Sequence, residues 1–145
     1  MTMTRTIARG VLSAVLIFAG VGHLTFARTA FSAQVPPWLP INADVVIISS
    51  GLVEIALGAS LALLTRWRVP IGRAIAIFFI VIFPGNISQF VLHISAFGLD
   101  TDLARGVRLL FQPVLVVWAL WCTRAWPAAR AKTDPTTGTP SEVPH

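Results

Sequence analysis

The sequence carries few charged side chains for its length. Of its 145 residues, 12% are charged and 55% are hydrophobic. A soluble domain carries roughly 25% charged residues, so this chain has too little charge to cover a surface that faces water. We therefore expect a single-domain integral membrane protein.

Cysteine and nucleic-acid motifs are also scarce. Cys122 is the single cysteine, which excludes an internal disulfide and any dithiol redox chemistry within this chain. The net charge of +5 comes from arginines at the ends of apolar runs, and no basic patch with interleaved aromatics is present. We therefore expect no nucleic acid as a partner, and we assign no metal site.

Four long apolar runs dominate the rest of the chain. They predict an all-α fold, a bundle of four transmembrane helices at about 7–26, 45–65, 70–93 and 103–126, because about 20 apolar residues span a bilayer as a helix. We expect the first run to be a retained helix, not a cleaved signal peptide. Residues 1–126 would form the membrane domain. Residues 127–145, which lack an apolar period, are predicted to be a disordered tail.

Helix-breaking and helix-capping residues separate these runs. Residues 28–44 are predicted to be a loop, because three prolines interrupt them: Pro36, Pro37 and Pro40. Asn42 or Asp44 is expected to cap the second helix, and Asp102 the fourth. Pro84 and Gly85 are expected to kink or locally unwind the third helix.

The basic residues predict how the bundle is oriented. One side of the four spans carries most of them: Arg5, Arg9, Arg66, Arg68, Arg73, Arg124, Arg130 and Lys132. The other side carries Arg28, Arg105 and Arg108 together with Asp44, Asp100 and Asp102. Loops rich in Lys and Arg stay cytoplasmic, so we expect both termini in the cytoplasm and the protein in the plasma membrane.

Polar residues inside the apolar runs indicate a site. Glu54 is the only acidic residue within those runs, and a carboxylate at that depth must face protein or water. The other three helices carry polar groups at a similar depth in their outer halves. These observations predict an outward-facing polar pocket with the ligand-binding candidates Glu54, His23, Asn86, Gln89, His93, Arg108 and Gln112. Each of these residues also has a purely structural interpretation, as a hydrogen-bonding group that fixes helix packing.

Several segments are similar to one known family. FAGVGHLT, VPPWLP, SGLVEIALGASLALL, FPGNISQF and RLLFQPVLVVWAL resemble the DoxX family of small four-helix membrane proteins, over about residues 7–126. The resemblance implies a four-helix bundle in the plasma membrane. It also implies a link to thiosulfate:quinone oxidoreduction or to oxidative-stress complexes, without a catalytic set to carry over.

Three functions fit these features. The first is an accessory subunit of a membrane redox system, such as a quinone-linked oxidoreductase, that binds a quinone-like ligand and is not an enzyme alone. The second is a structural or assembly subunit without a ligand. The third, which we favour least, is a haem-binding protein with His23 and His93 as axial ligands. The expected partners are the lipid bilayer and either a membrane redox protein or a second copy of the chain.

Overall fold

The computed structural model describes residues 2–96 and 101–126. Within these ranges every regular element is helical, and no strand is present: α1 (Met3–Leu24), α2 (Arg28–Ser32), α3 (Ala43–Leu63), the short 3₁₀ helix η1 (Thr65–Trp67), α4 (Arg68–Val91) and α5 (Asp102–Thr123). Four of these helical segments are long and apolar enough to span a membrane. The predicted all-helical fold with four such helices is therefore confirmed. The predicted tail lies outside the described residues.

The helix ends differ slightly from the predicted ones. Each long helix begins and ends somewhat earlier in the chain than predicted. α3 begins after Asn42, whose side chain accepts a hydrogen bond from the backbone N–H of Asp44 at 2.8 Å. The expected cap of α5 was wrong. Thr101 caps that helix by accepting a hydrogen bond from Ala104 N at 3.2 Å, and Asp102 is the first residue inside it.

Two further expectations are corrected by the structure. The segment 28–44 is not all loop, because α2 forms in it before the first of its prolines. Of the kink or local unwinding expected at Pro84 and Gly85, the unwinding does not occur, since α4 continues through them. Pro84 lacks the N–H that would bond the carbonyl of Ile80, four residues earlier. α5 packs along α4, and Gln112 donates a hydrogen bond to the carbonyl of Phe79, the residue before Ile80.

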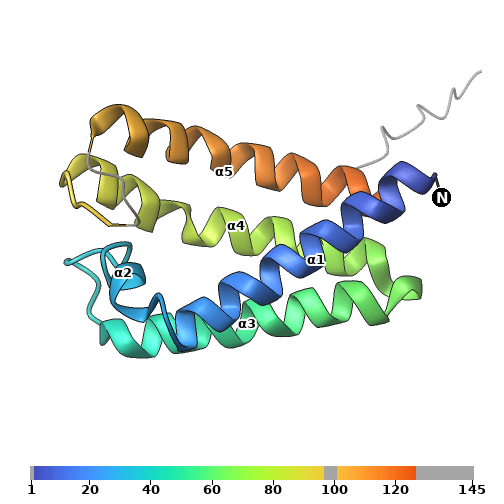
Figure 1. The fold of residues 1–145 in the computed structure, drawn as a ribbon, viewed down its shortest axis with the longest axis horizontal. Coiled ribbons are helices and arrows are strands. Elements are labelled where there is room, and N and C mark those ends of the chain that lie inside the picture. Colours follow the sequence, from blue (N-terminus) through green and yellow to red (C-terminus); the bar gives the residue numbers. More distant parts are fainter. Residues whose placement is uncertain (1, 97–100, 127–145) are drawn as a thin grey trace, which may run out of the picture.

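The long helices pack as two pairs. α1 packs mainly on α3 and α4 mainly on α5, whereas the contacts between the pairs are much less extensive (Figure 1). Glycine permits the first pairing, because a Cβ on Gly51 would lie 2.7 Å from the Cβ of His23 and 2.9 Å from the carbonyl oxygen of Gly20. The hydroxyl of Ser13 donates to the carbonyl of Gly58 at 2.7 Å. Small residues thus bring the two backbones close together.

The two ends of the bundle are packed differently. We call the end where α1 begins and α5 ends the terminal end, and the opposite end the α2 end (Figure 1). The buried hydrophobic core lies toward the terminal end and comprises Leu12, Leu16, Leu61, Ile75, Phe79, Ala119 and Cys122. Exposed tryptophans lie near both ends, Trp38 in the segment before α3 and Trp67, Trp121 and Trp126 at the terminal end. Such placement is typical of aromatic belts at membrane surfaces.

Candidate functional site

A cavity of about 610 Å³ lies between the two helix pairs, toward the α2 end. Its walls come from all four long helices and from residues 28–41, which we call the strap. Most of the lining is apolar, including Leu16, Ile47, Phe78, Phe79 and Leu115. Small-molecule sites typically have volumes of roughly 300–1,000 Å³ and mostly apolar walls with a few polar groups. The cavity therefore has the size and lining of a ligand site.

A histidine–carboxylate pair forms part of its wall. His23 Nδ1 lies 2.7 Å from Glu54 Oε2, and both residues are buried, at 8% and 5% exposure. The ring of Phe31 stacks on the imidazole, with centroids 3.5 Å apart. If Nδ1–H donates to the carboxylate, the other ring nitrogen, Nε2, remains to accept from or donate to a ligand. No described residue hydrogen-bonds Nε2 of His23.

Arg108 places a guanidinium on the same cavity. It lines the wall with Glu54 and interacts with that carboxylate electrostatically. With the Gln34 amide oxygen turned toward it, Arg108 donates from Nη2 at 2.7 Å and from Nε at 3.1 Å. In the structure, the side chain that hydrogen-bonds Glu54 directly is His23.

Two buried amides connect α4 to α5. Asn86 Nδ2 donates to Gln112 Oε1 at 3.0 Å, and Gln112 Nε2 donates to the carbonyl of Phe79 at 2.8 Å. Gln112 lines the cavity, whereas Asn86 does not. Asn86 Oδ1 is buried and has no hydrogen-bond partner within the described part of the chain. The amide pair joins α4 to α5. The unpartnered acceptor of Asn86 lowers the stability that this link provides, because a buried acceptor without a hydrogen bond is costly.

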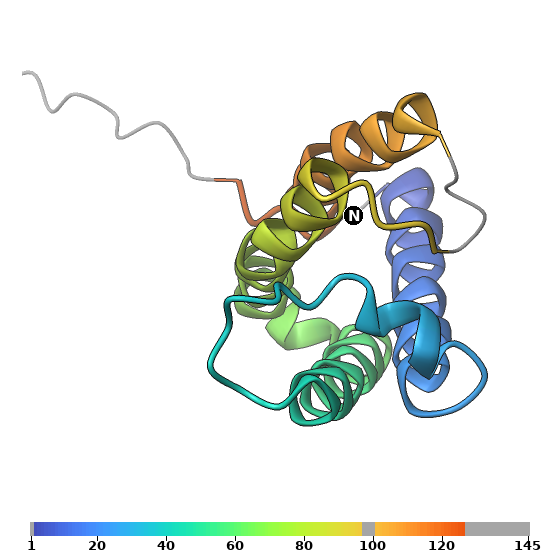
Figure 2. The same ribbon diagram turned by 90° about the vertical axis from the view of Figure 1, so that its left-hand side faces the viewer.

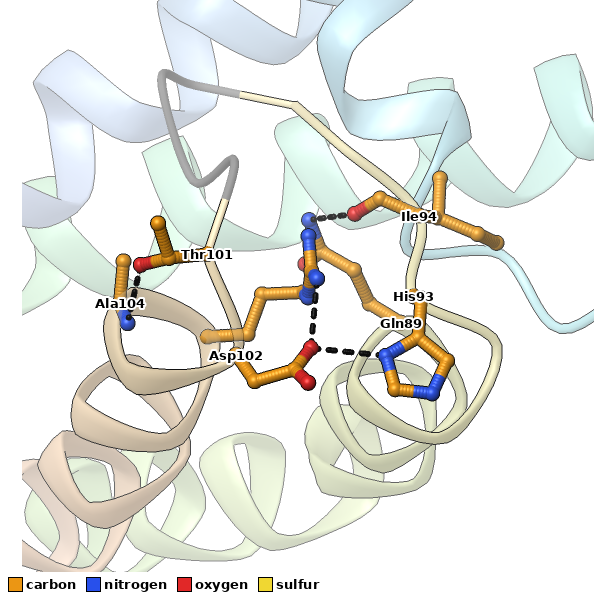
Figure 3. Close-up of polar contacts among 7 residues, drawn as sticks. Gln89, His93, Ile94, Thr101, Asp102 and Ala104 are labelled. Carbon is orange, nitrogen blue, oxygen red and sulfur yellow. Dashed lines mark hydrogen bonds and ion pairs between the residues drawn. The ribbon is translucent and has the colours of Figure 1, made fainter.

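The remaining candidates belong to a separate cluster where α4 ends and α5 begins (Figure 3). His93 Nδ1 lies 2.7 Å from Asp102 Oδ1, and Arg105 Nη2 donates to the same oxygen at 2.6 Å. Gln89 donates to the carbonyl of Ile94 at 3.2 Å. This cluster links the end of α4 to the first turn of α5. His93, two residues after the last residue of α4, has a φ of 54°.

The structure therefore divides the predicted site. Glu54, His23, Arg108 and Gln112 line one cavity, whereas Asn86, Gln89 and His93 do not. His23 and His93 share no cavity, so this geometry gives a haem no pair of axial ligands. Among residues 2–96 and 101–126, no three His, Cys, Asp or Glu side chains are grouped as a metal ion would require.

Sequence reasoning missed the contribution of the strap. Phe31 and Gln34 both line the cavity and contact the polar site. The one sequence signal for them was the short stretch TAFSAQV between the first helix and the prolines, which has room for a helical turn. Ser50 also lines the cavity. It was missed because one serine in an apolar helix is not distinctive.

Comparisons with known proteins give one finding. No curated protein and no solved structure matches the chain. One family matches residues 12–123, from α1 to the last residue of α5, and its description is Domain of unknown function (DUF8561). Nothing in the comparisons links the chain to the DoxX family, so that resemblance stays a prediction. Because the match covers most of the chain, the protein belongs to the DUF8561 family.

Proposed function

We propose that the protein is a membrane-embedded accessory subunit that binds a small amphipathic, quinone-like molecule in the cavity. One observation carries this proposal. A mainly apolar cavity of about 610 Å³, among helices long enough to span a bilayer, has a His–Glu pair and an arginine on its wall. Ionisable residues at such depth are costly and usually mark functional sites.

The polar groups suit a molecule with a polar head and an apolar body. A quinone presents carbonyl oxygens that accept hydrogen bonds, and its ring and tail prefer apolar walls. The Arg108 guanidinium supplies donors, and His23 Nε2 can exchange a proton with a ligand oxygen. Glu54 and Arg108 have opposite charges, which lowers the cost of keeping both groups away from water. A neutral ligand with acceptor oxygens therefore fits better than an ion.

The proposed role is binding, with electrons supplied by a partner. Cys122 is buried in the core, away from the cavity lining, so a thiol relay to the site has no support. The resemblance to the DoxX family favours a quinone-linked redox system as the setting. The basic residues of the terminal end, including Arg5, Arg66 and Arg124, favour cytoplasmic termini in the plasma membrane.

Quinone binding to variants of the purified protein tests this proposal. His23→Ala and Glu54→Gln should each weaken binding by about tenfold or more, because each removes one partner of the polar pair, and tenfold corresponds to about 1.4 kcal/mol. His93→Ala is the matched control, since that histidine lies outside the cavity. The measurement is quinone retained through gel filtration in lipid nanodiscs, counted by mass spectrometry.

Two outcomes contradict ligand binding. Wild-type protein that binds no quinone removes the proposal directly. A Glu54→Gln protein that no longer folds, beside a His23→Ala protein that binds normally, would instead favour the structural alternative. The buried Asn86–Gln112 hydrogen bond is the observation that supports this second function, since it joins α4 to α5 directly.

A further inference from the structure

We infer that the ligand reaches the cavity sideways from the bilayer, between α3 and α4, and that its apolar tail lies in that gap. The ligand class is then a lipid-dissolved molecule with a long hydrocarbon or isoprenoid chain, not a water-soluble metabolite. This inference rests on the proposed function and adds the route and the second half of the ligand.

The first part of the argument is that the strap closes the α2 end of the cavity. On the α1 and α3 side it is held twice. The ring of Phe31 stacks on His23, and Arg28 Nη2 lies 3.1 Å from Asp44 Oδ1. After α2 the strap crosses the end of the bundle before it enters α3 (Figure 2).

The strap is also seated on the α4 and α5 pair. The backbone carbonyl of Gln34 packs directly against Gly85, where a Cβ would overlap it. The Gln34 side chain reaches Arg108 on α5. In the residues that follow Gln34, Pro36 is buried, and Val35 and Leu39 face the cavity. A molecule arriving from water at this end would have to displace contacts to all four long helices.

The second part is that the cavity opens between the helix pairs. Contacts between α3 and α4 are few compared with those inside each pair. Val46 and Ser50 lie on the edge of α3 that faces away from α1, and Val81 lies on the facing edge of α4. All three line the cavity, yet Val81 is 67% exposed. Val81 therefore reaches both the cavity and the outer surface of the bundle, at the level of the spanning helices.

The opposite side of the cavity, between α1 and α5, is the competing route. It is lined by Val15 and Ala19 of α1 and by Phe111 and Leu115 of α5. Contacts between α1 and α5 are also few, and Val15 and Phe111 are 43% and 52% exposed. Val81 is more exposed than either, and the side chain of Ser50 on α3 is much smaller than that of Phe111 on α5. The strap residues Trp38 and Ile41 also line the cavity and are mostly exposed. They lie shortly before α3 in the chain. An apolar chain lying past Ser50 would therefore have apolar surface along its length.

Two quinones with the same ring, one with a long isoprenoid tail and one with a short tail, test the inference. Ser50→Phe narrows the α3–α4 gap, and Ala19→Phe narrows the α1–α5 side. Leu52→Phe is the control, because Leu52 is exposed on α3 and does not line the cavity. We expect Ser50→Phe to lower the ratio of long-tail to short-tail affinity by about tenfold relative to Leu52→Phe. Short-tail binding that remains measurable shows that the variant is folded.

Three results would overturn the inference and leave the proposed function standing. These are equal binding of both quinones by the wild type, equal effects of Ser50→Phe and Leu52→Phe, and a loss of long-tail binding in Ala19→Phe alone. Wild-type protein that binds neither quinone would instead remove the proposed function itself. The two failures are therefore distinguishable in one set of measurements.

Discussion

Glu54 shows how a single carboxylate is accommodated inside an apolar bundle. It is 5% exposed, it hydrogen-bonds His23, and it interacts electrostatically with Arg108. Removing one partner of a buried pair leaves an uncompensated charge, which is more costly than the pair is stabilising. His23 and Arg108 therefore matter to the folded state as well as to any ligand.

Gly51 is the residue whose replacement should be most informative about α1–α3 packing. A Cβ there would lie 2.7 Å from His23 Cβ, so Gly51→Ala should lower the free energy of unfolding by about 1–3 kcal/mol. Gly10 is the matched control on α1, because a Cβ there meets nothing within 4 Å. Gly10→Ala should be neutral or stabilising by about 0.5 kcal/mol, since alanine favours a helix over glycine.

Thermal unfolding in detergent, followed by circular dichroism, measures both variants. The close α1–α3 packing described above would be wrong if Gly51→Ala and Gly10→Ala unfolded at the same temperature. A shift confined to Gly51→Ala would also predict weakened quinone binding, because His23 stands against that glycine.

The sequence predicted the depth of the polar residues along their helices but not which of them are in contact. Depth along each helix follows from the rise per residue, and this placed His23, Glu54, Arg108 and Gln112 at similar heights. It could not say which side chain meets which, because pairing depends on how each helix is rotated about its axis. His23 lies near the end of α1, where it packs against Gly51 and Glu54 of α3 and is also covered by Phe31 of the strap.

At the scale of elements, the ends of the helices are set by particular side chains. Asn42 accepts from the N–H of Asp44, which satisfies one of the unpaired donors at the start of α3. Asn42→Ala should therefore lower stability by about 1 kcal/mol, whereas Asn42→Ser should retain most of it, because serine also caps helices. Urea titration in mixed micelles measures the difference. Equal destabilisation by alanine and serine would show that the cap hydrogen bond contributes nothing.

The elements themselves differed in how far sequence could predict them. The long helices follow from apolar length alone, and hydropathy located all four. α2 has only five residues, too few to be stable by propensity, so its helical form depends on tertiary contacts such as Phe31 with His23. At Pro84 the sequence shows a helix breaker, yet α4 continues through it.

At the scale of the whole molecule, the distribution of charge predicts topology. Cysteine labelling in a Cys122→Ala background tests it, with Thr29→Cys on α2 and Thr65→Cys at the start of η1, both exposed positions. If the termini are cytoplasmic, a membrane-impermeant maleimide added to intact cells should label Thr29→Cys and not Thr65→Cys. The arginines at the terminal end supply the physical reason.

Permeabilised cells provide the control for this experiment, because both cysteines should then react. Labelling of Thr65→Cys alone in intact cells would show the opposite orientation, with both termini outside the cytoplasm. The strap and its proposed side opening would then face the cytoplasmic leaflet, and the proposed site would exchange with molecules of that leaflet.

The core at the terminal end and the cavity toward the α2 end make the bundle stiffer at one end than at the other. The two helix pairs pack together where Leu12, Leu61, Ile75 and Ala119 meet. Toward the other end the cavity separates them and the strap bridges them. Regions with fewer buried contacts open at lower free-energy cost. The two helix pairs should therefore move apart at the α2 end, with the packed terminal end as the hinge. The size of a bound molecule would then set the distance between the pairs.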